Sequence, residues 1–172
     1  MLPHTLSMEE FKNDYIKDEN ESSVMIGLCE EQVVPISLSF EKNPHLLIVG
    51  QYRKGKTNSI KVILQSLVKN QEVMIGLYDN VDRGLLSFTK HENVDYLDSK
   101  EEIVKWLDQV ELIMQKRETY YSDCVRNKKE IPSFPKIVFL VDHFARFQQN
   151  SDSIMHDRLA KFMKEGSYLG FS

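Results

Sequence analysis

The feature that most constrains this chain is an eight-residue stretch, Gly50-Gln51-Tyr52-Arg53-Lys54-Gly55-Lys56-Thr57. It fits the pattern G-x-x-x-x-G-K-[ST] of a phosphate-binding loop at every fixed position. The apolar run His45–Val49 leads into the loop, and a helical stripe follows it from about Lys56. A strand, this loop and a helix follow one another in a P-loop fold. We therefore expect His45–Val49 to be a strand buried on both faces of a parallel sheet.

The residue types of the loop suit the phosphates of a nucleotide. Two glycines let the backbone curl so that successive N–H groups point at a phosphate, and the following helix adds its positive N-terminal end. Lys56 would reach the β- and γ-phosphates, and the Thr57 hydroxyl would bind Mg²⁺. ATP and Mg²⁺ are thus the expected ligands. The bulky Tyr52, Arg53 and Lys54 either point outward or crowd the phosphate, and the sequence leaves both readings open.

A second Mg²⁺ ligand is expected at the end of another apolar strand. Asp142 follows Ile137–Val141, and Asp79 follows Val73–Tyr78. We prefer Asp142, because its run is purely apolar and comes after a long crossover, and we interpret Asp79 as an ordinary strand-ending turn residue. The predicted metal ligands are therefore Thr57 and Asp142.

His143 occupies the position after Asp142, where an ATPase of this architecture usually has a glutamate as general base. A neutral imidazole could accept a proton, but its reach and geometry differ from those of a carboxylate. We therefore name His143 as the catalytic candidate, expect ATP hydrolysis to be slow or absent, and keep a purely structural role for His143 as the alternative.

The N-terminal part is expected to form a helix and linker over residues 1–22, followed by the main domain over residues 23–172. Ser7 and Glu10 have the spacing of a capping box, and Phe11 and Tyr15 then share one helical face. Two short alternating runs, Val24–Leu28 and Val34–Phe40, predict a hairpin whose second strand lies at an edge because of Pro35.

The remaining elements predict an α/β fold, a mostly parallel sheet flanked by helices. Strands are expected at Val73–Tyr78, Val94–Leu97 and Lys136–Val141. A long helix begins at a Ser99/Glu102 capping box and extends towards Cys124, and a last helix ends at Gly166. A further strand is expected to begin at residues 170–172 beside the Asp142 strand, so that the domain is incomplete at its C-terminus.

Composition narrows the class of protein. The 172 residues carry 22 Lys and Arg against 26 Asp and Glu, a net charge of -4, which makes nucleic acid an improbable partner. The longest apolar run, Ile137–Val141, is far shorter than a membrane span, so this stretch is expected to be soluble. Cys29 and Cys124 lack metal spacing and are expected to be reduced thiols.

Several segments together resemble FtsK/SpoIIIE-type ATPase domains, over roughly residues 24–172. The P-loop with its preceding Asn43–Val49 is similar to that family, as are the hairpin and Gly84-Leu85-Leu86. Glu111–Tyr121, with Arg117 inside, resembles its long helix, and Val141–Phe144 resembles the end of its second motif. The resemblance implies a RecA/FtsK-like P-loop NTPase fold with an N-terminal hairpin.

Within that family the acidic balance and the His143 site look most like a later, degenerate module, such as the third, of the membrane-anchored motor of the Gram-positive type VII secretion system. This implies ATP binding with weak or no hydrolysis. It also implies neighbouring ATPase modules in the same chain, contacts with small helical secreted proteins or secretion components, and a hexamer of the full-length protein. The place implied is the cytoplasmic face of the cell membrane.

Three other functions stay open. One is a pseudo-ATPase that serves as an interaction or regulatory platform, in which Arg53 or Lys54 fills the phosphate site or contacts a partner. Another is an FtsK-type DNA translocase module. The third, a small-molecule kinase, would want Arg-rich lid segments, for which only Asp82-Arg83 and Arg146 are nearby. Arg117 and Arg146 could act as arginine fingers, although an arginine on a long helix is more often a surface or salt-bridge residue.

Overall fold

The computed structural model describes residues 7, 9–10, 23–29, 31 and 34–172. The chain divides into two compact units, Met1–Asn70 and Gln71–Ser172, and each is described by itself.

In the first unit, β1 (Ser23–Leu28) and β2 (Pro35–Ser39) form the predicted antiparallel hairpin. The pairing register shifts between Met25 and Gly27. Such a bulge interrupts the strict alternation of faces, and Ile26 is 38% exposed while Val24 is buried. The predicted capping box is confirmed: the Ser7 amide donates to Glu10, and the Glu10 amide donates to Ser7 Oγ. The rest of the predicted N-terminal helix, with Phe11 and Tyr15, lies outside the described residues.

Helix α2 (Lys56–Leu67) confirms the helix predicted after the loop. Its apolar stripe is buried as expected, over Ile60, Ile63, Leu64 and Leu67, with Val68 just beyond.

The strand predicted before the loop is wrong for this structure. Residues 43–50 belong to no strand in the described part of the chain, and Leu47 and Val49 are 77% and 83% exposed. An apolar run becomes a strand only when a neighbouring strand satisfies its backbone N–H and C=O groups. No such pairing is formed by His45–Val49, so the sequence pattern alone overstated its burial.

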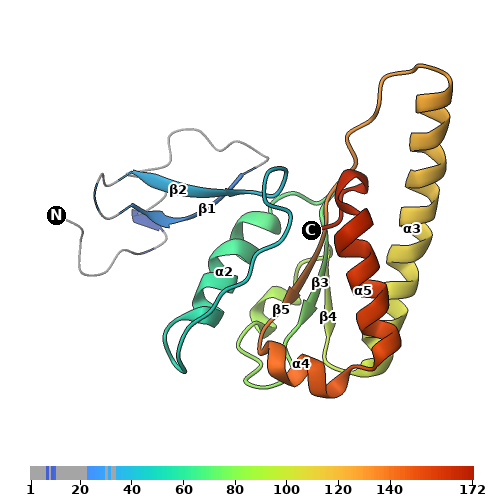
Figure 1. Cartoon of the computed structure of the whole chain (residues 1–172). Coiled ribbons are helices and arrows are strands. Elements are labelled where there is room, and N and C mark those ends of the chain that lie inside the picture. The colour runs from blue at the N-terminus through green and yellow to red at the C-terminus, as the bar shows by residue number, and fades with distance from the viewer. Residues whose placement is uncertain (1–6, 8, 11–22, 30, 32–33) are drawn as a thin grey trace. The chain divides into compact units, whose positions relative to one another are not determined.

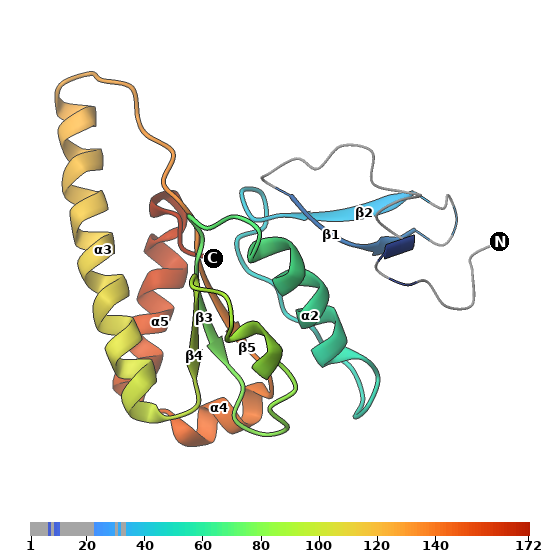
Figure 2. The same ribbon diagram turned by 180° about the vertical axis from the view of Figure 1, so that it is seen from behind.

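The second unit contains a parallel three-stranded sheet, as predicted. β3 (Met74–Tyr78) lies in the middle, with β4 (Val94–Leu97) on one side and β5 (Ile137–Val141) on the other. Helices α3 (Lys100–Arg126) and α5 (Ser153–Glu165) run side by side along the sheet (Figures 1 and 2). The shorter elements are α4 (Phe144–Asn150) and two 3₁₀ turns, η1 (Leu86–Phe88) and η2 (Ser167–Leu169).

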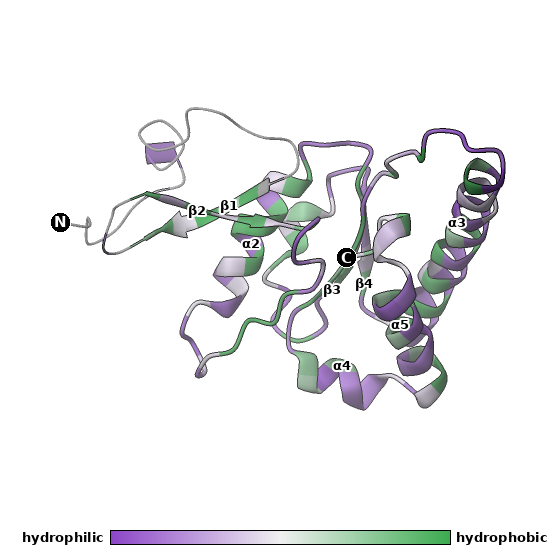
Figure 3. Cartoon of the chain, turned by 45° about the horizontal axis from the view of Figure 1, so that its top comes forward, coloured by the Kyte–Doolittle hydropathy of each residue, from purple (hydrophilic) through white to green (hydrophobic). Residues whose placement is uncertain are grey.

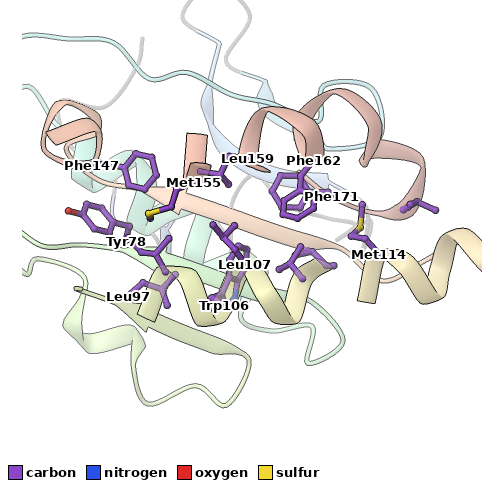
Figure 4. Close-up of a cluster of buried hydrophobic side chains, with 14 residues drawn as sticks. Tyr78, Leu97, Trp106, Leu107, Met114, Phe147, Met155, Leu159, Phe162 and Phe171 are labelled. Atoms are coloured by element: carbon purple, nitrogen blue, oxygen red, sulfur yellow. The ribbon is translucent and has the colours of Figure 1, made fainter. Parts of the chain in front are cut away.

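The apolar faces of α3 and α5 meet in one core with the sheet (Figure 4). The Trp106 indole of α3 stacks on Phe139 of β5 with ring centroids 5.2 Å apart. Gly76 of β3 leaves the room for it, because a Cβ there would lie 2.5 Å from the indole. Figure 3 shows the polar residues that share α3 with this apolar stripe. The long helix reaches past Cys124 as predicted, and Cys124 is buried, whereas Tyr120 is 55% exposed.

Local signals at the helix ends are largely confirmed. Ser99 Oγ accepts the Glu102 amide at the start of α3, and Gly166 follows the end of α5. Gly166 does not adopt the left-handed conformation of many C-terminal caps. A Cβ there would instead collide with the Phe162 carbonyl oxygen at 2.4 Å, so close packing requires the glycine.

Residues 170–172 lie beside β5, as expected, but they form only an isolated bridge and no strand. Phe171 forms a parallel bridge with Ile137, and the Ile137 amide donates to the Gly170 carbonyl at 2.9 Å. None of the helices in the described ranges is long and apolar enough to span a bilayer.

Candidate functional site

The predicted phosphate loop forms a tight turn that runs into α2. The Lys54 amide donates to the Gln51 carbonyl, and Gly55 is left-handed at φ 88°. Arg53 is also left-handed, at φ 57°, which is unusual for a residue with a side chain. Gly55 thus takes a conformation that glycine adopts at least cost.

The N-terminus of α2 is well suited to an anion. Within the described part of the chain, no side chain caps the helix, and no acidic residue lies in its first turn. The first N–H groups of a helix lack intrahelical partners and carry the positive end of the helix dipole. A phosphate at this position would satisfy both features.

The predicted phosphate-binding lysine, Lys56, turns back over the loop. Its Nζ donates to the carbonyl oxygens of Gly50 at 3.0 Å and Gln51 at 2.9 Å. These contacts hold the ammonium group over the turn. Thr57, the predicted Mg²⁺ ligand of the loop, is half-buried in the first turn of α2.

The three bulky loop residues are exposed. Tyr52 is 70% exposed, and the Arg53 guanidinium lies over the Tyr52 ring at 5.2 Å from its centroid. Lys54 is also exposed. The carbonyls of the loop are bonded by Lys56 rather than by Arg53 or Lys54. Of the two arrangements that the sequence left open, this favours the outward one.

In the second unit, the predicted metal ligand Asp142 ends β5 and is only 3% exposed. Its amide donates to the Tyr78 carbonyl at 2.9 Å, which extends the β3–β5 pairing by one step. Asp79, the other sequence candidate, ends the neighbouring β3 and is fully buried. The two carboxylate-bearing residues therefore end neighbouring strands at the same edge of the sheet.

Asp79 has a structural task, as the sequence reading preferred. Its Oδ2 accepts the Leu85 amide at 2.8 Å and its carbonyl accepts the Tyr96 hydroxyl at 2.6 Å, so it organises the loop after β3. Burial, and then the nearby Asp79 charge, raise the pKa of Tyr96 to about 12.

His143 begins α4 in the left-handed region, at φ 60° and ψ 63°. Its Nε2 lies 3.3 Å from Asp82 Oδ2 and 4.0 Å from Asp142 Oδ2. Sequence reasoning named Asp82 only as part of a lid. It missed this contact because 61 residues separate Asp82 from His143 and only the β3–β5 pairing brings them together.

The two arginine-finger candidates differ in the structure. Arg117 is half-buried and donates to the carbonyls of Pro135 and Leu169, at 2.8 and 2.6 Å, while stacking over the Phe134 ring. Burial lowers the pKa of Arg117. Arg117 is therefore a structural clamp, whereas Arg146 is exposed and its guanidinium donates to Gln149.

The two predicted Mg²⁺ ligands offer oxygen atoms, a hydroxyl on Thr57 and a carboxylate on Asp142. Among the described residues, no three or more His, Cys, Asp or Glu side chains gather to hold a metal. Mg²⁺ keeps several waters and needs only one or two protein ligands beside substrate phosphates. One buried carboxylate, Asp142, and one hydroxyl, Thr57, fit that requirement in type. Thr57 belongs to the first unit and Asp142 to the second.

Comparison with known proteins shows full-length similarity to secretion proteins. The chain is 42% identical to the ESX secretion system protein EccC of Geobacillus thermodenitrificans over 99% of its length, and 42% identical to the ESX secretion system protein YukB of Bacillus subtilis over 100%. It spans only 12% of the length of each. The DNA translocase FtsK of Corynebacterium glutamicum is more distant, at 25% identity over 88% of this chain and 19% of FtsK. No family model matches the chain.

Solved structures agree on the fold. The cytoplasmic domain of EssC matches with a TM-score of 0.93 and 41% identity, covering 99% of this chain and 34% of that one. A chain containing ATPases 2 and 3 of EssC from Geobacillus thermodenitrificans matches with a TM-score of 0.91 and 42% identity, covering 99% and 32%. The predicted P-loop α/β class is thereby confirmed, and the second of these structures contains two ATPase modules.

Proposed function

We propose that this chain, which belongs with the EssC, EccC and YukB proteins of ESX secretion, is a module of a type VII protein secretion motor. The module would bind ATP and hydrolyse it weakly or not at all. The observation that best supports ATP binding is the structure of the loop at the start of α2. There an uncapped helix end, without acid in its first turn, follows a turn spanned by the Lys56 ammonium. Both features suit a triphosphate.

In this proposal, Gly50–Thr57 would hold the phosphates through backbone amides and Lys56. Thr57 and Asp142 would hold Mg²⁺, which when bound neutralises the charge of the β- and γ-phosphates. ATP occupancy would bias how this module packs against neighbouring ATPase modules of the same long protein.

Weak hydrolysis is proposed because the residue after Asp142 is a histidine. A general base must reach the attacking water with suitable geometry. The His143 ring lies beside two carboxylates, Asp82 and Asp142, so its Nε2 is engaged with protein groups.

The larger context is also a proposal. Small helical secreted proteins or secretion components would be the cargo or partners. The full-length protein would assemble as a hexamer at the cytoplasmic face of the cell membrane. An FtsK-type DNA translocase module is the weaker reading, because the similarity to FtsK is 25% against 42% for the secretion proteins.

Isothermal titration of this chain with Mg-ATP tests the proposal, with Lys56→Ala as the matched control. We expect saturable heat for the natural chain and its loss in the variant. A natural chain that gives no more heat than Lys56→Ala would support the pseudo-ATPase platform instead. Phosphate release that rises strongly on adding duplex DNA would support the translocase reading.

A further inference from the structure

Two exposed side chains of the phosphate loop contact each other in a way that the proposed ATP site does not use. The Arg53 guanidinium lies over the face of the Tyr52 ring, with its Cζ 5.2 Å from the ring centroid. Tyr52 is 70% exposed, and Arg53 is exposed as well. Both residues belong to the first unit, together with the rest of the loop and α2. The whole arrangement therefore lies within one compact unit.

The Tyr52 ring is a weak partner for the Arg53 guanidinium. Within the described ranges, the guanidinium forms no ion pair and no hydrogen bond, so its N–H donors are available. The attraction of a cation to an exposed aromatic ring is small. A hydrogen bond from arginine to a phosphate is charge-assisted and often bidentate, which makes it stronger. A phosphate within reach would therefore draw the guanidinium off the ring.

The backbone of Arg53 carries its side chain at a cost. Arg53 is left-handed, at φ 57°, a conformation that glycine adopts freely but that a Cβ disfavours. The same loop does carry a glycine at its other left-handed position, Gly55. Residues with a Cβ that are held in such conformations gather at ligand-binding and switch regions. A task of the guanidinium would account for the cost.

The loop leaves the γ-phosphate to its side chains. In a loop of this pattern, the backbone amides hold the α- and β-phosphates, and the lysine reaches the β- and γ-phosphates. The Lys56 ammonium is tied to the carbonyls of Gly50 and Gln51, so it lies over the turn. Arg53 belongs to the same turn and adds a second cation there. The γ-phosphate is therefore the group that a second loop cation would serve.

We propose that Arg53 is a second cation for the γ-phosphate of ATP, held on the Tyr52 ring until the nucleotide binds. The inference rests on the proposed binding of ATP at the phosphate loop. When ATP binds, the guanidinium leaves the ring and donates to oxygens of the γ-phosphate. ADP lacks this phosphate, so with ADP the guanidinium stays on Tyr52. Arg53 thus makes the module distinguish ATP from ADP, and Tyr52 is its positioning residue.

Isothermal titration of the whole chain with Mg-ATP, and separately with Mg-ADP, tests the role of Arg53. Arg53→Ala should raise the Kd for ATP about tenfold, as expected for the loss of a charged hydrogen bond, and that for ADP by less than about twofold. Arg53→Lys should give an intermediate Kd for ATP, because lysine keeps the charge but not the planar fork of donors. Lys42→Ala is the matched control, because it removes an exposed cation from the turn after β2, outside the loop, and should bind both nucleotides like the natural chain.

Variants of Tyr52 test whether the ring holds the guanidinium back. Tyr52→Ala should lower the Kd for ATP about two- to fivefold, the factor that an exposed cation–π contact is worth, and leave the Kd for ADP unchanged. Tyr52→Phe keeps the face of the ring and should restore the natural Kd for ATP. The double variant Tyr52→Ala/Arg53→Ala should bind ATP like Arg53→Ala, because Tyr52 acts only through Arg53.

Three outcomes would overturn the inference. Arg53→Ala could bind ATP as tightly as the natural chain, it could weaken ATP and ADP equally, or Tyr52→Ala could bind ATP no more tightly than the natural chain. In each case ATP binding by the natural chain would still stand, and retained ADP binding shows that a variant is folded. A natural chain that gives no more heat with Mg-ATP than Lys56→Ala is a different result, which would overturn the proposed function together with this inference.

Discussion

Replacing Gly76 with alanine tests how the core of the second unit is built. Gly76 lies in the central strand β3, under the Trp106 indole of α3. A Cβ at this position would lie 2.5 Å from Trp106 Cε2, 2.6 Å from Cζ2 and 2.9 Å from Cδ2. The indole cannot move away freely, because it is 2% exposed and stacks on Phe139.

The expected cost follows from these distances. Ordinary carbon contacts lie at about 3.5 Å or more, so the ring must shift by about 1 Å. Overpacking of this kind costs about 1–3 kcal/mol. The lower backbone entropy of alanine in the unfolded chain returns about 0.5–1 kcal/mol. We therefore expect a net loss of about 1–2 kcal/mol in the free energy of unfolding, and a fall in Tm of about 2–4 °C for each kcal/mol lost in a chain of 172 residues.

Urea unfolding followed by tryptophan fluorescence is the assay. Trp106 is the only tryptophan of the chain, so the signal reports on the second unit directly. Gly27→Ala is the matched control in a strand, because a Cβ there would have no neighbour within 4 Å, and its midpoint should not fall. A Gly76→Ala midpoint equal to that of the natural chain would refute the reasoning, since it would show that the core yields by 1 Å at no cost.

Three further predictions concern single side chains. Arg117→Ala should lower the free energy of unfolding by about 2–3 kcal/mol, because two carbonyl oxygens lose a charged donor, and urea unfolding that shows no loss would contradict the clamp. Asp79→Ala should cost about 1–3 kcal/mol by leaving a buried loop amide without its acceptor, with Asp157→Ala as the unaffected control in the same assay. Ultraviolet titration should show Tyr96 and Tyr168 ionising only at about pH 12, the first mainly because of burial and the second mainly because of its hydrogen bond to Glu118. Both pKa values are raised above the ordinary tyrosine pKa of about 10. The contribution of the two tyrosines to stability should therefore be complete below pH 10 and be lost as the pH rises through 12. Ionisation of every tyrosine near pH 10 would contradict this prediction.

The elements that local sequence specifies were predicted well. The loop that ends at Lys56 and the helix that follows it need only the glycine pattern and one apolar stripe. The capping box at Ser99 depends on residues three positions apart, and it forms as expected. Strands β3 and β5 were found because their apolar runs are short and end at turn residues. Such signals act within a few residues, so sequence suffices to detect them.

Contacts between distant segments could not be predicted in the same way. His45–Val49 has the composition of a buried strand, but pairing requires a free neighbouring edge, and the sequence does not say whether one is present. The sequence offered Arg117 as an arginine-finger candidate, yet its guanidinium binds carbonyls 18 and 52 residues away. These outcomes depend on the packing of the whole unit.

The residues of the candidate site also fall into those predicted from local sequence and those whose contacts depend on the tertiary structure. Sequence by itself located the predicted phosphate-binding loop, the acid that follows β5 and the histidine after it, because the order of residue types along the chain carries that information. Only the tertiary structure showed that Asp79 is fully buried and accepts the Leu85 amide, and that Asp82 contacts His143. The physical reason is that parallel pairing of β3 with β5 brings the loops after both strands to the same end of the sheet. The strands pair through backbone hydrogen bonds, which every residue type except proline can form, so the sequence of one strand does not show which strand is its neighbour.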